Sequence, residues 1–238
     1  MPMKCLSPYT EPVEPQMRSE WAKSVARQLC RDSLAWAKTI LAVAGAELAK
    51  PKGAGGDGAS RKEQLFAEVL AYSLCLLEMR LTKDLAAGNK DLARRVRHEC
   101  AMLIAQAARR KQNRHRRLPV PDPANSRYAQ IYPAPGSAGR RPPRLTREMF
   151  EQFCRCTGME SNVLVGKGEN LATLVFYIAV HGVISADGLP SREAMLKLLE
   201  AARACSAHLQ GVAAKWAGSR RTDGQLSFPA SRKWIGLG

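Results

Sequence analysis

A run of arginines is the part of the sequence whose residue types point most directly to chemistry. Six of the nine residues between positions 109 and 117 are basic: Arg109, Arg110, Lys111, Arg114, Arg116 and Arg117. The guanidinium group donates two parallel hydrogen bonds to a phosphate and stays charged at any relevant pH. On a helix, several of these side chains share one stripe, and further arginines precede them on the solvent side at Arg94, Arg95 and Arg97. The spacing predicts a cationic helical arm that binds phosphates.

The composition of this run is similar to the short arginine-rich RNA-binding segments of viral and phage proteins. The resemblance covers about nine residues, in which Gln112 and Asn113 offer groups for base edges. After the run, Tyr128 and Tyr132 stand beside Arg127, and unpaired bases can stack on such rings. We therefore expect RNA rather than DNA as the ligand, with further phosphate contacts from Arg140, Arg141 and Arg144.

Motifs for catalysis or cofactor binding are weak by comparison. The four histidines form no H-E-x-x-H pattern, and no G-x-S-x-G nucleophile elbow occurs. Gly53, Gly55 and Gly58 spell G-x-G-x-x-G, but a helix rather than a strand precedes them. His98-Glu99-Cys100 and Cys154-Arg155-Cys156 are the only pairs that resemble metal ligands, so whether Cys154 and Cys156 bind a metal stays open. We expect no enzyme activity, no cofactor and no resident metal.

The charge is concentrated in particular segments of the chain. The 238 residues carry 37 Lys and Arg against 21 Asp and Glu, a net charge of +16. Residues 89–117 contribute +8, residues 118–145 contribute +3 and the tail 218–238 contributes +3, whereas 61–88 and 146–217 are neutral. Such clustering builds a local field that attracts polyanions. A basic surface that is merely solvated, a nuclear-import signal and a patch for anionic lipids remain alternatives.

Hydrophobic periodicity predicts helices over most of the chain. Helices are expected at 18–50, at 60–87 as the central helix after a Ser60–Glu63 capping box, and at 90–117. Residues 118–145 hold seven of the fourteen prolines and predict an extended linker. Further helices are expected at 146–157, 170–183 and 191–217, with a strand as the competing interpretation of 173–180.

Together these patterns predict a mainly α protein of two small helical lobes joined by a Pro-rich linker, with a basic helical arm. The expected units are a flexible N-terminus (1–17), an N-terminal helical bundle (18–108), the arm (109–117), the linker (118–145), a C-terminal lobe (146–217) and a basic tail (218–238). No run of apolar residues is long enough to span a bilayer. The scattered cysteines suggest reduced thiols packed as small hydrophobes in an intracellular protein.

We therefore expect a non-enzymatic nucleic-acid-binding protein, cytoplasmic, nuclear or associated with a virion, that self-associates through its helical lobes. A nucleocapsid, packaging or RNA-sequestering protein would fit. The alternatives are a DNA-binding accessory protein of a plasmid or phage, and a helical adaptor whose basic run is only a nuclear-targeting signal.

Overall fold

The computed structural model describes residues 15–44, 60–83, 88–112, 122–132, 147–157, 169–185 and 191–219. In these ranges every regular element is helical, which confirms the mainly α prediction and the helix at 173–180. The elements are α1 (Pro15–Ala44), α2 (Arg61–Lys83), α3 (Gly88–Gln112), the 3-10 turn η1 (Pro123–Asn125), α4 (Arg127–Ile131), α5 (Arg147–Thr157), α6 (Glu169–Ile184) and α7 (Arg192–Gly218). Gly88 follows the apolar run of the second helix, where a glycine predicts a C-terminal cap, but it is the first residue of α3.

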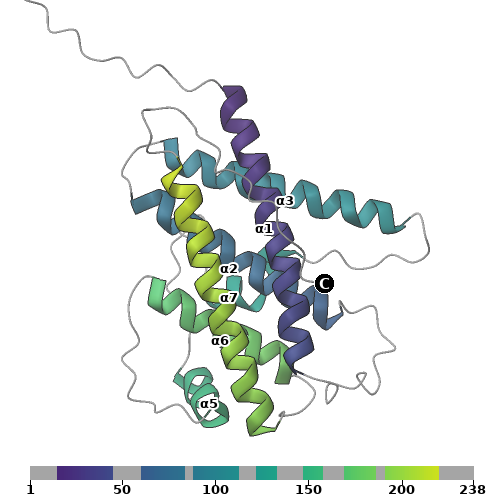
Figure 1. Cartoon of the computed structure of the whole chain (residues 1–238), viewed down its shortest axis with the longest axis vertical. Helices are drawn as coiled ribbons and strands as arrows, with labels where there is room; N and C mark the ends of the chain where they lie inside the picture. Colours follow the sequence, from purple (N-terminus) through teal and green to yellow (C-terminus); the bar gives the residue numbers. More distant parts are fainter. Residues whose placement is uncertain are drawn as a thin grey trace, which may run out of the picture.

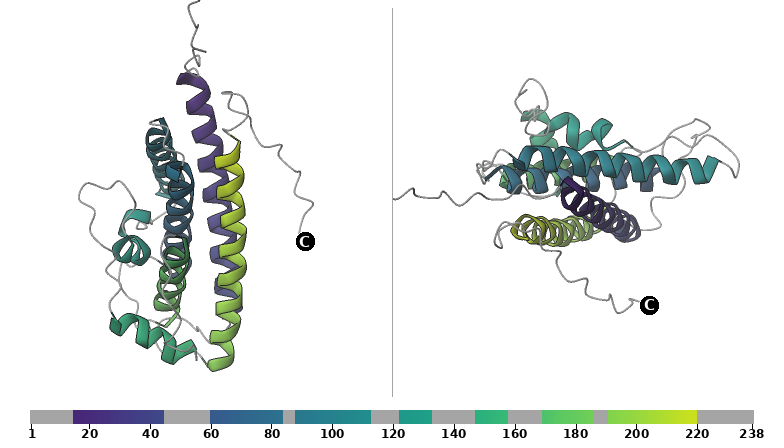
Figure 2. Two further views of the ribbon diagram at one scale, coloured as in Figure 1. Left: turned by 90° about the vertical axis from the view of Figure 1, so that its left-hand side faces the viewer. Right: turned by 90° about the horizontal axis from the view of Figure 1, so that it is seen from above.

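Helix α2 is the centre of the molecule, as its nearly unbroken apolar sequence predicts. Residues 67–78 are all buried, and α2 packs against α1, α3, α4, α6 and α7. Figure 2 shows α1 and α7 side by side in one layer, with α2, α3 and α6 behind them and the short α4 on the far side. A helix surrounded in this way is expected to be apolar on nearly all sides, which explains most of its sequence.

Hydrogen bonds at the helix ends follow the sequence signals. The Glu63 carboxylate accepts from the Ser60 backbone N–H at 3.0 Å, and the Ser60 hydroxyl accepts from the Glu63 N–H at 3.3 Å. This is the predicted capping box at the start of α2. The Ser191 hydroxyl accepts from the Ala194 N–H at 3.2 Å and begins α7 in the same way.

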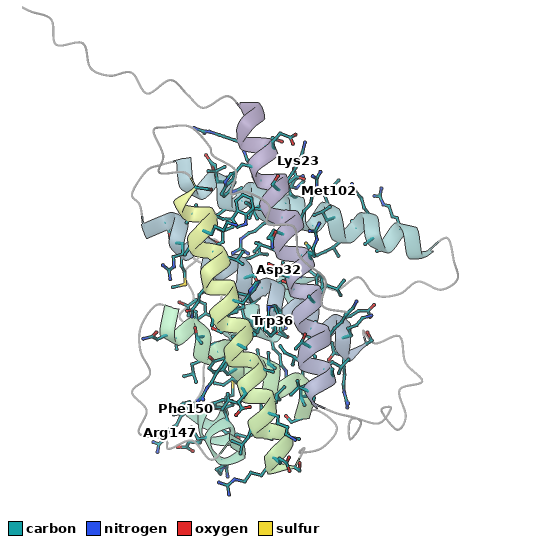
Figure 3. The ribbon with its side chains drawn as sticks, viewed as in Figure 1. Lys23, Asp32, Trp36, Met102, Arg147 and Phe150 are labelled. Atoms are coloured by element: carbon teal, nitrogen blue, oxygen red, sulfur yellow. The ribbon has the colours of Figure 1, made fainter. Side chains whose placement is uncertain are left out.

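Helices α1 and α7 are tied together although they lie far apart in the sequence (Figure 3). The Trp21 and Trp216 rings meet edge to face with centroids 6.0 Å apart, and the Trp21 indole N–H donates to the Ser219 hydroxyl at 3.3 Å. About three turns further along α1, the buried Asp32 carboxylate lies 3.3 Å from His208 Nε2. Because aromatic and polar contacts both cross this seam, the first and last helices of the described chain form one layer.

The hydrophobic core runs across the boundary at which two lobes were predicted. One cluster of buried residues includes side chains from α1, α2 and α3 and also from α6 and α7. The Tyr72 hydroxyl of α2 bonds to Ser206 of α7 at 2.6 Å and to Thr173 of α6 at 2.9 Å. The prediction of two separate lobes is therefore wrong: the helices on both sides of the proline-rich stretch build the same core.

Candidate nucleic-acid interface

Several exposed basic side chains lie on the outward face of α3. Successive helical residues are separated by about 100°, so positions seven apart, such as Arg95, Met102 and Arg109, lie on one face. All three are exposed, as are Arg94 and His98 beside them. The opposite face buries other residues, among them Leu92, Val96 and Cys100. Packing of that apolar side against α1 and α2 therefore fixes which side of α3 faces solvent.

The C-terminal part of α3 extends beyond the helices that pack against its first turns. Figure 1 shows α3 crossing behind α1 and projecting to one side of the bundle. Met102 is 45% exposed, whereas Leu103 and Ile104 are still partly buried against the core. The backbone is described as helical to Gln112. This geometry places Arg109, the first residue of the predicted basic arm, on the projecting part of α3.

The basic side chains of this face form few ion pairs with carboxylates. Arg94 Nη1 lies 3.5 Å from Asp91, and the Arg94 side chain is 81% exposed. Arg95 and Arg109 make no ion pair within the part of the chain that the structure describes. Two exposed cations elsewhere, Arg147 and Lys197, are each held by a carboxylate one turn away, in the pairs Arg147–Glu151 and Lys197–Glu193, both at 2.6 Å. Unpaired arginines keep their hydrogen-bond donors free for an anionic ligand.

Arg97 does not belong to this surface, although the sequence placed it there. Its guanidinium pairs with the carboxylate of Glu78 on α2, with Nε 3.2 Å from Oε2 and a closer contact through Nη2. Glu78 is 9% exposed, so the arginine neutralises a buried charge between α2 and α3. Arg97 therefore stabilises the packing of α3 against α2.

The aromatic residues predicted to stack on bases are also part of the fold. Tyr128 is 1% exposed, in a short helix that packs against α2 and α6. Its ring meets Tyr72 edge to face at 5.6 Å, and Tyr72 stacks on Phe176 at 4.3 Å. Tyr132 lies 5.9 Å from Tyr128 and is partly buried against the same core. The prediction of an extended linker offering these rings is therefore wrong for residues 122–132.

A buried carboxylate of α2 holds this short helix in place. Glu68 is 3% exposed, and its two oxygens accept the backbone N–H groups of Arg127 at 2.8 Å and Tyr128 at 2.7 Å. Burial raises the pKa of Glu68, while these two hydrogen bonds and the Arg127 charge oppose the rise. The Ser126 hydroxyl accepts from the Ala129 N–H at 3.1 Å. The first turn of α4 is thus capped from its own chain and from α2.

Arg127 itself lies at the edge of the core. The residue is exposed, yet its guanidinium passes close to α6, where a Cβ added to Gly182 would lie 1.9 Å from Nη1. Glycine at position 182 therefore leaves room for the arginine. For the other residues predicted to contact nucleic acid, the structure gives less. The backbones of Arg110 and Lys111 are described but their side chains are not. Six further arginines lie outside the described residues: Arg114, Arg116, Arg117, Arg140, Arg141 and Arg144.

A second row of basic residues lies on α1, outside the segments predicted to bind nucleic acid. Arg27, Arg31 and Lys38 are exposed at spacings of four and seven, with the 41% exposed Leu34 between them. None of the three forms an ion pair with a described residue. Counting charge over residues 1–60 hid the row, because that segment includes acidic residues that balance it. The helical spacing of the three cations is the signal that would have revealed it.

Sites of other kinds are poorly supported in the described ranges. No three His, Cys, Asp or Glu side chains there lie close enough to hold a metal ion, and no helix there is both long and apolar enough to cross a membrane. Cys154 is buried on α5, while the Cys156 side chain lies outside the described part. A water-sized apolar cavity lies between α5, α6 and α7, with His181 on its wall.

Comparisons with known proteins add no relative. The chain matches no protein-family model, no curated protein and no solved structure.

Proposed function

We propose that this protein binds nucleic acid through the outward face of α3 and the arginine-rich residues that follow it. The observation that carries the proposal is the set of exposed arginines on one face of a projecting helix, Arg94, Arg95 and Arg109, whose charges lack strong partners in the described structure. Arg95 and Arg109 are separated by about 21 Å of helix axis, a span that covers several phosphates of a nucleic-acid strand. Within residues 110–117 the sequence adds five more basic side chains along the same direction.

The chemistry of this binding is recognition of the phosphate backbone. Each arginine or lysine that neutralises a phosphate releases condensed counterions, so affinity falls steeply as salt rises. The exposed guanidinium groups have few bonds to lose before they meet a phosphate. The prediction of stacking by Tyr128 no longer argues for RNA, because that ring is buried. We still prefer RNA to DNA as the ligand, and this preference now rests only on the composition of residues 109–117.

The test is a salt series that compares two variants of equal charge. One replaces Arg94, Arg95 and Arg109 with Ala; the matched control replaces Arg147, Arg192 and Lys197, which are exposed on α5 and α7. Both variants lose three positive charges. Binding of labelled single-stranded RNA, duplex RNA and duplex DNA is measured from about 50 to 200 mM salt, where counterion release dominates.

The expected result is a loss of affinity in the α3 variant alone. For a duplex, its slope of log affinity against log salt should become shallower by about 2 to 3, since each lost phosphate contact removes roughly 0.9. A second variant at Arg110, Arg114, Arg116 and Arg117 should weaken binding further. Equal weakening by the control would show that only net charge matters, and an unchanged α3 variant would overturn the proposal in favour of a protein partner.

Self-association is proposed as a companion property. Its basis is the neutral charge of the helical segments 61–88 and 146–217, and the mass of the purified protein in solution tests it. A monomer at all concentrations, with nucleic-acid binding retained, would remove self-association without touching the α3 interface.

A further inference from the structure

The small cavity between α5, α6 and α7 has a wall that is almost entirely apolar. Phe153 of α5, Val180 of α6 and Leu198 of α7 each contribute aromatic or aliphatic surface to it. His181 of α6 lies on the same wall and is 6% exposed. Its Nε2 is buried and has no hydrogen-bond partner among the described residues. Because a buried polar atom without a partner costs free energy, this nitrogen is the unusual feature of the cavity.

Hydrogen bonds on the other side of the imidazole determine what Nε2 can bind. The Ser185 hydroxyl lies 2.9 Å from the His181 carbonyl oxygen and 3.4 Å from His181 Nδ1. A carbonyl oxygen only accepts, so the single hydroxyl proton is used in the shorter contact. The Ser185 oxygen then accepts from the Nδ1–H, which leaves Nε2 as a lone pair. Burial and the Arg127 charge both lower the pKa of His181, so the imidazole stays neutral at neutral pH and Nε2 accepts a hydrogen bond.

The chemistry of the wall selects for one kind of ligand. A buried water molecule ordinarily makes about three hydrogen bonds, whereas this wall offers one acceptor surrounded by apolar surface. A charged molecule would lose its hydration against the same surface at a high cost in free energy. A neutral molecule with an apolar body and a single O–H or N–H group matches both the wall and the nitrogen.

Helix α5 closes this cavity, which now has room only for a water-sized group, so a larger ligand requires α5 to move. The helix lies at one end of the bundle and packs on α6 and α7 (Figure 1), with Phe150 and Phe153 against the core. Its Arg147–Glu151 ion pair lies within the helix and does not tie it to the bundle. The Phe153 ring meets the His181 ring edge to face, with centroids 5.8 Å apart. An outward shift of α5 would therefore enlarge the cavity beside His181.

We propose that this cavity is the closed form of a binding site for a small neutral molecule that has an apolar body and one O–H or N–H donor. The ligand donates its hydrogen bond to His181 Nε2, and its body packs against Val180 and Leu198. Phe153 moves outward with α5 to admit the ligand and then forms the outer wall of the site. Phenols and indoles have this chemistry. The inference does not depend on whether α3 binds nucleic acid.

The experiment compares phenol with toluene, which carries a methyl group in place of the hydroxyl. Calorimetry measures the affinity of the full-length protein for each probe, and nuclear magnetic resonance of isotope-labelled histidine follows the imidazole nitrogens. We expect saturable binding of phenol, about fivefold to tenfold tighter than that of toluene, because only phenol satisfies Nε2. The resonance of His181 Nε2 should move from the position of a free nitrogen to that of a hydrogen-bonded one.

Three results would overturn the proposal: no saturable binding of phenol, equal affinity for the two probes, or no change at His181 Nε2. The last includes the case in which Nε2 is already hydrogen-bonded in the protein alone and phenol leaves it unchanged. The cavity would then hold a water molecule only.

Variants separate the hydrogen bond from the movement of α5. His181→Leu removes the acceptor, so phenol should then bind no more tightly than toluene, and the lost resonance identifies Nε2. His98→Leu, at an exposed histidine on α3, is the matched control and should leave both affinities unchanged. Phe153→Leu makes room beside His181 and should strengthen binding of both probes while keeping the preference for phenol. A preference for phenol that survives His181→Leu, or weaker binding of both probes by folded Phe153→Leu, would contradict the assigned site.

Discussion

The outward face of α3 and the segment from η1 to α4 differ in how far the fold uses their predicted ligand-binding residues. Both contain arginine close to residues able to contact bases, and both were predicted to bind nucleic acid. On α3, Arg95 and Arg109 are exposed without an ion pair in the described structure. In the second segment Tyr128 is 1% exposed, and the backbone of the first turn is held by Glu68.

Neighbouring residues account for the difference. Tyr128 and Ile131 are three apart on α4 and both are buried, so even a five-residue helix has an apolar face to pack. Asp122 and Ser126 cap η1 and α4, and α2 supplies a buried carboxylate that accepts the N–H groups of Arg127 and Tyr128. The last four residues of α3, Arg109 to Gln112, include no apolar side chain that could pack in this way. A cationic segment stays available to a ligand when no other part of the fold packs against it or pairs with its charged and hydrogen-bonding groups.

The largest expected effect is on stability and comes from removing the Tyr128 ring. Tyr128→Ala should lower the free energy of unfolding by about 3 to 5 kcal/mol, because it leaves a cavity beside Tyr72. Denaturant unfolding followed by circular dichroism measures it. At temperatures where the variant is folded, affinity for nucleic acid should match that of the parent protein. Lost affinity with unchanged stability would instead return Tyr128 to the binding site.

A smaller loss of stability is expected when the cap from α2 is removed. Glu68→Ala leaves the N–H groups of Arg127 and Tyr128 buried or partly buried without an acceptor, which should cost about 2 to 4 kcal/mol. Glu68→Gln, which keeps one carbonyl acceptor, should cost less. Hydrogen exchange at residues 127 and 128 gives the direct measurement, and slow exchange at these amides in Glu68→Ala would contradict the role of the cap.

The α3 face was predictable from the sequence because a long amphipathic helix encodes its own solvent side. The apolar spacing of Leu92, Val96 and Cys100 is enough to place Arg95 and Arg109 opposite the core. The pairing of Arg97 with Glu78 was not predictable, because the two residues meet only through the packing of α2 against α3. The burial of Tyr128 likewise depends on Glu68, sixty residues earlier in the chain. Local periodicity determines a helix face, whereas the partners of a polar group are set by tertiary packing.

The row on α1 allows the comparison to be extended to a second helix. Replacing Arg27, Arg31 and Lys38 with Ala should weaken nucleic-acid binding by about tenfold, or roughly 1.4 kcal/mol, if a strand that lies on α3 also reaches α1. Stability should change little, since the three side chains are exposed. The Arg147, Arg192 and Lys197 variant is again the control of equal charge. An unchanged affinity would confine the interface to α3 and the residues after it.

A pH effect is expected where α4 meets α6. Burial lowers the pKa of His181, and the nearby Arg127 charge lowers it further. Its Nδ1 lies 3.4 Å from the Ser185 hydroxyl, Nε2 is buried without a hydrogen-bond partner, and Phe153 of α5 and Leu198 of α7 present apolar surface.

Because the folded pKa of His181 lies below its unfolded value, the unfolded chain takes up the proton first on acidification. Stability should therefore fall as the pH drops from about 7 to about 5.5. The Tm of His181→Leu should fall by a few degrees less than that of the parent protein over this interval. Parallel pH curves for the two proteins would show that His181 does not carry the effect.

The smallest effect is expected from the Tyr128 hydroxyl, and it separates the ring from its polar group. The oxygen is buried beside the Cys75 thiol and makes no hydrogen bond of ordinary geometry. Tyr128→Phe removes a desolvated polar group and keeps the aromatic contacts with Tyr72, so stability should stay within about 0.5 kcal/mol of the parent or rise slightly. Denaturant unfolding of this variant beside Tyr128→Ala measures the contrast. A loss near that of Tyr128→Ala would mean that the hydroxyl holds α4 in place, and packing of the ring would then not explain why this segment folds while the end of α3 stays exposed.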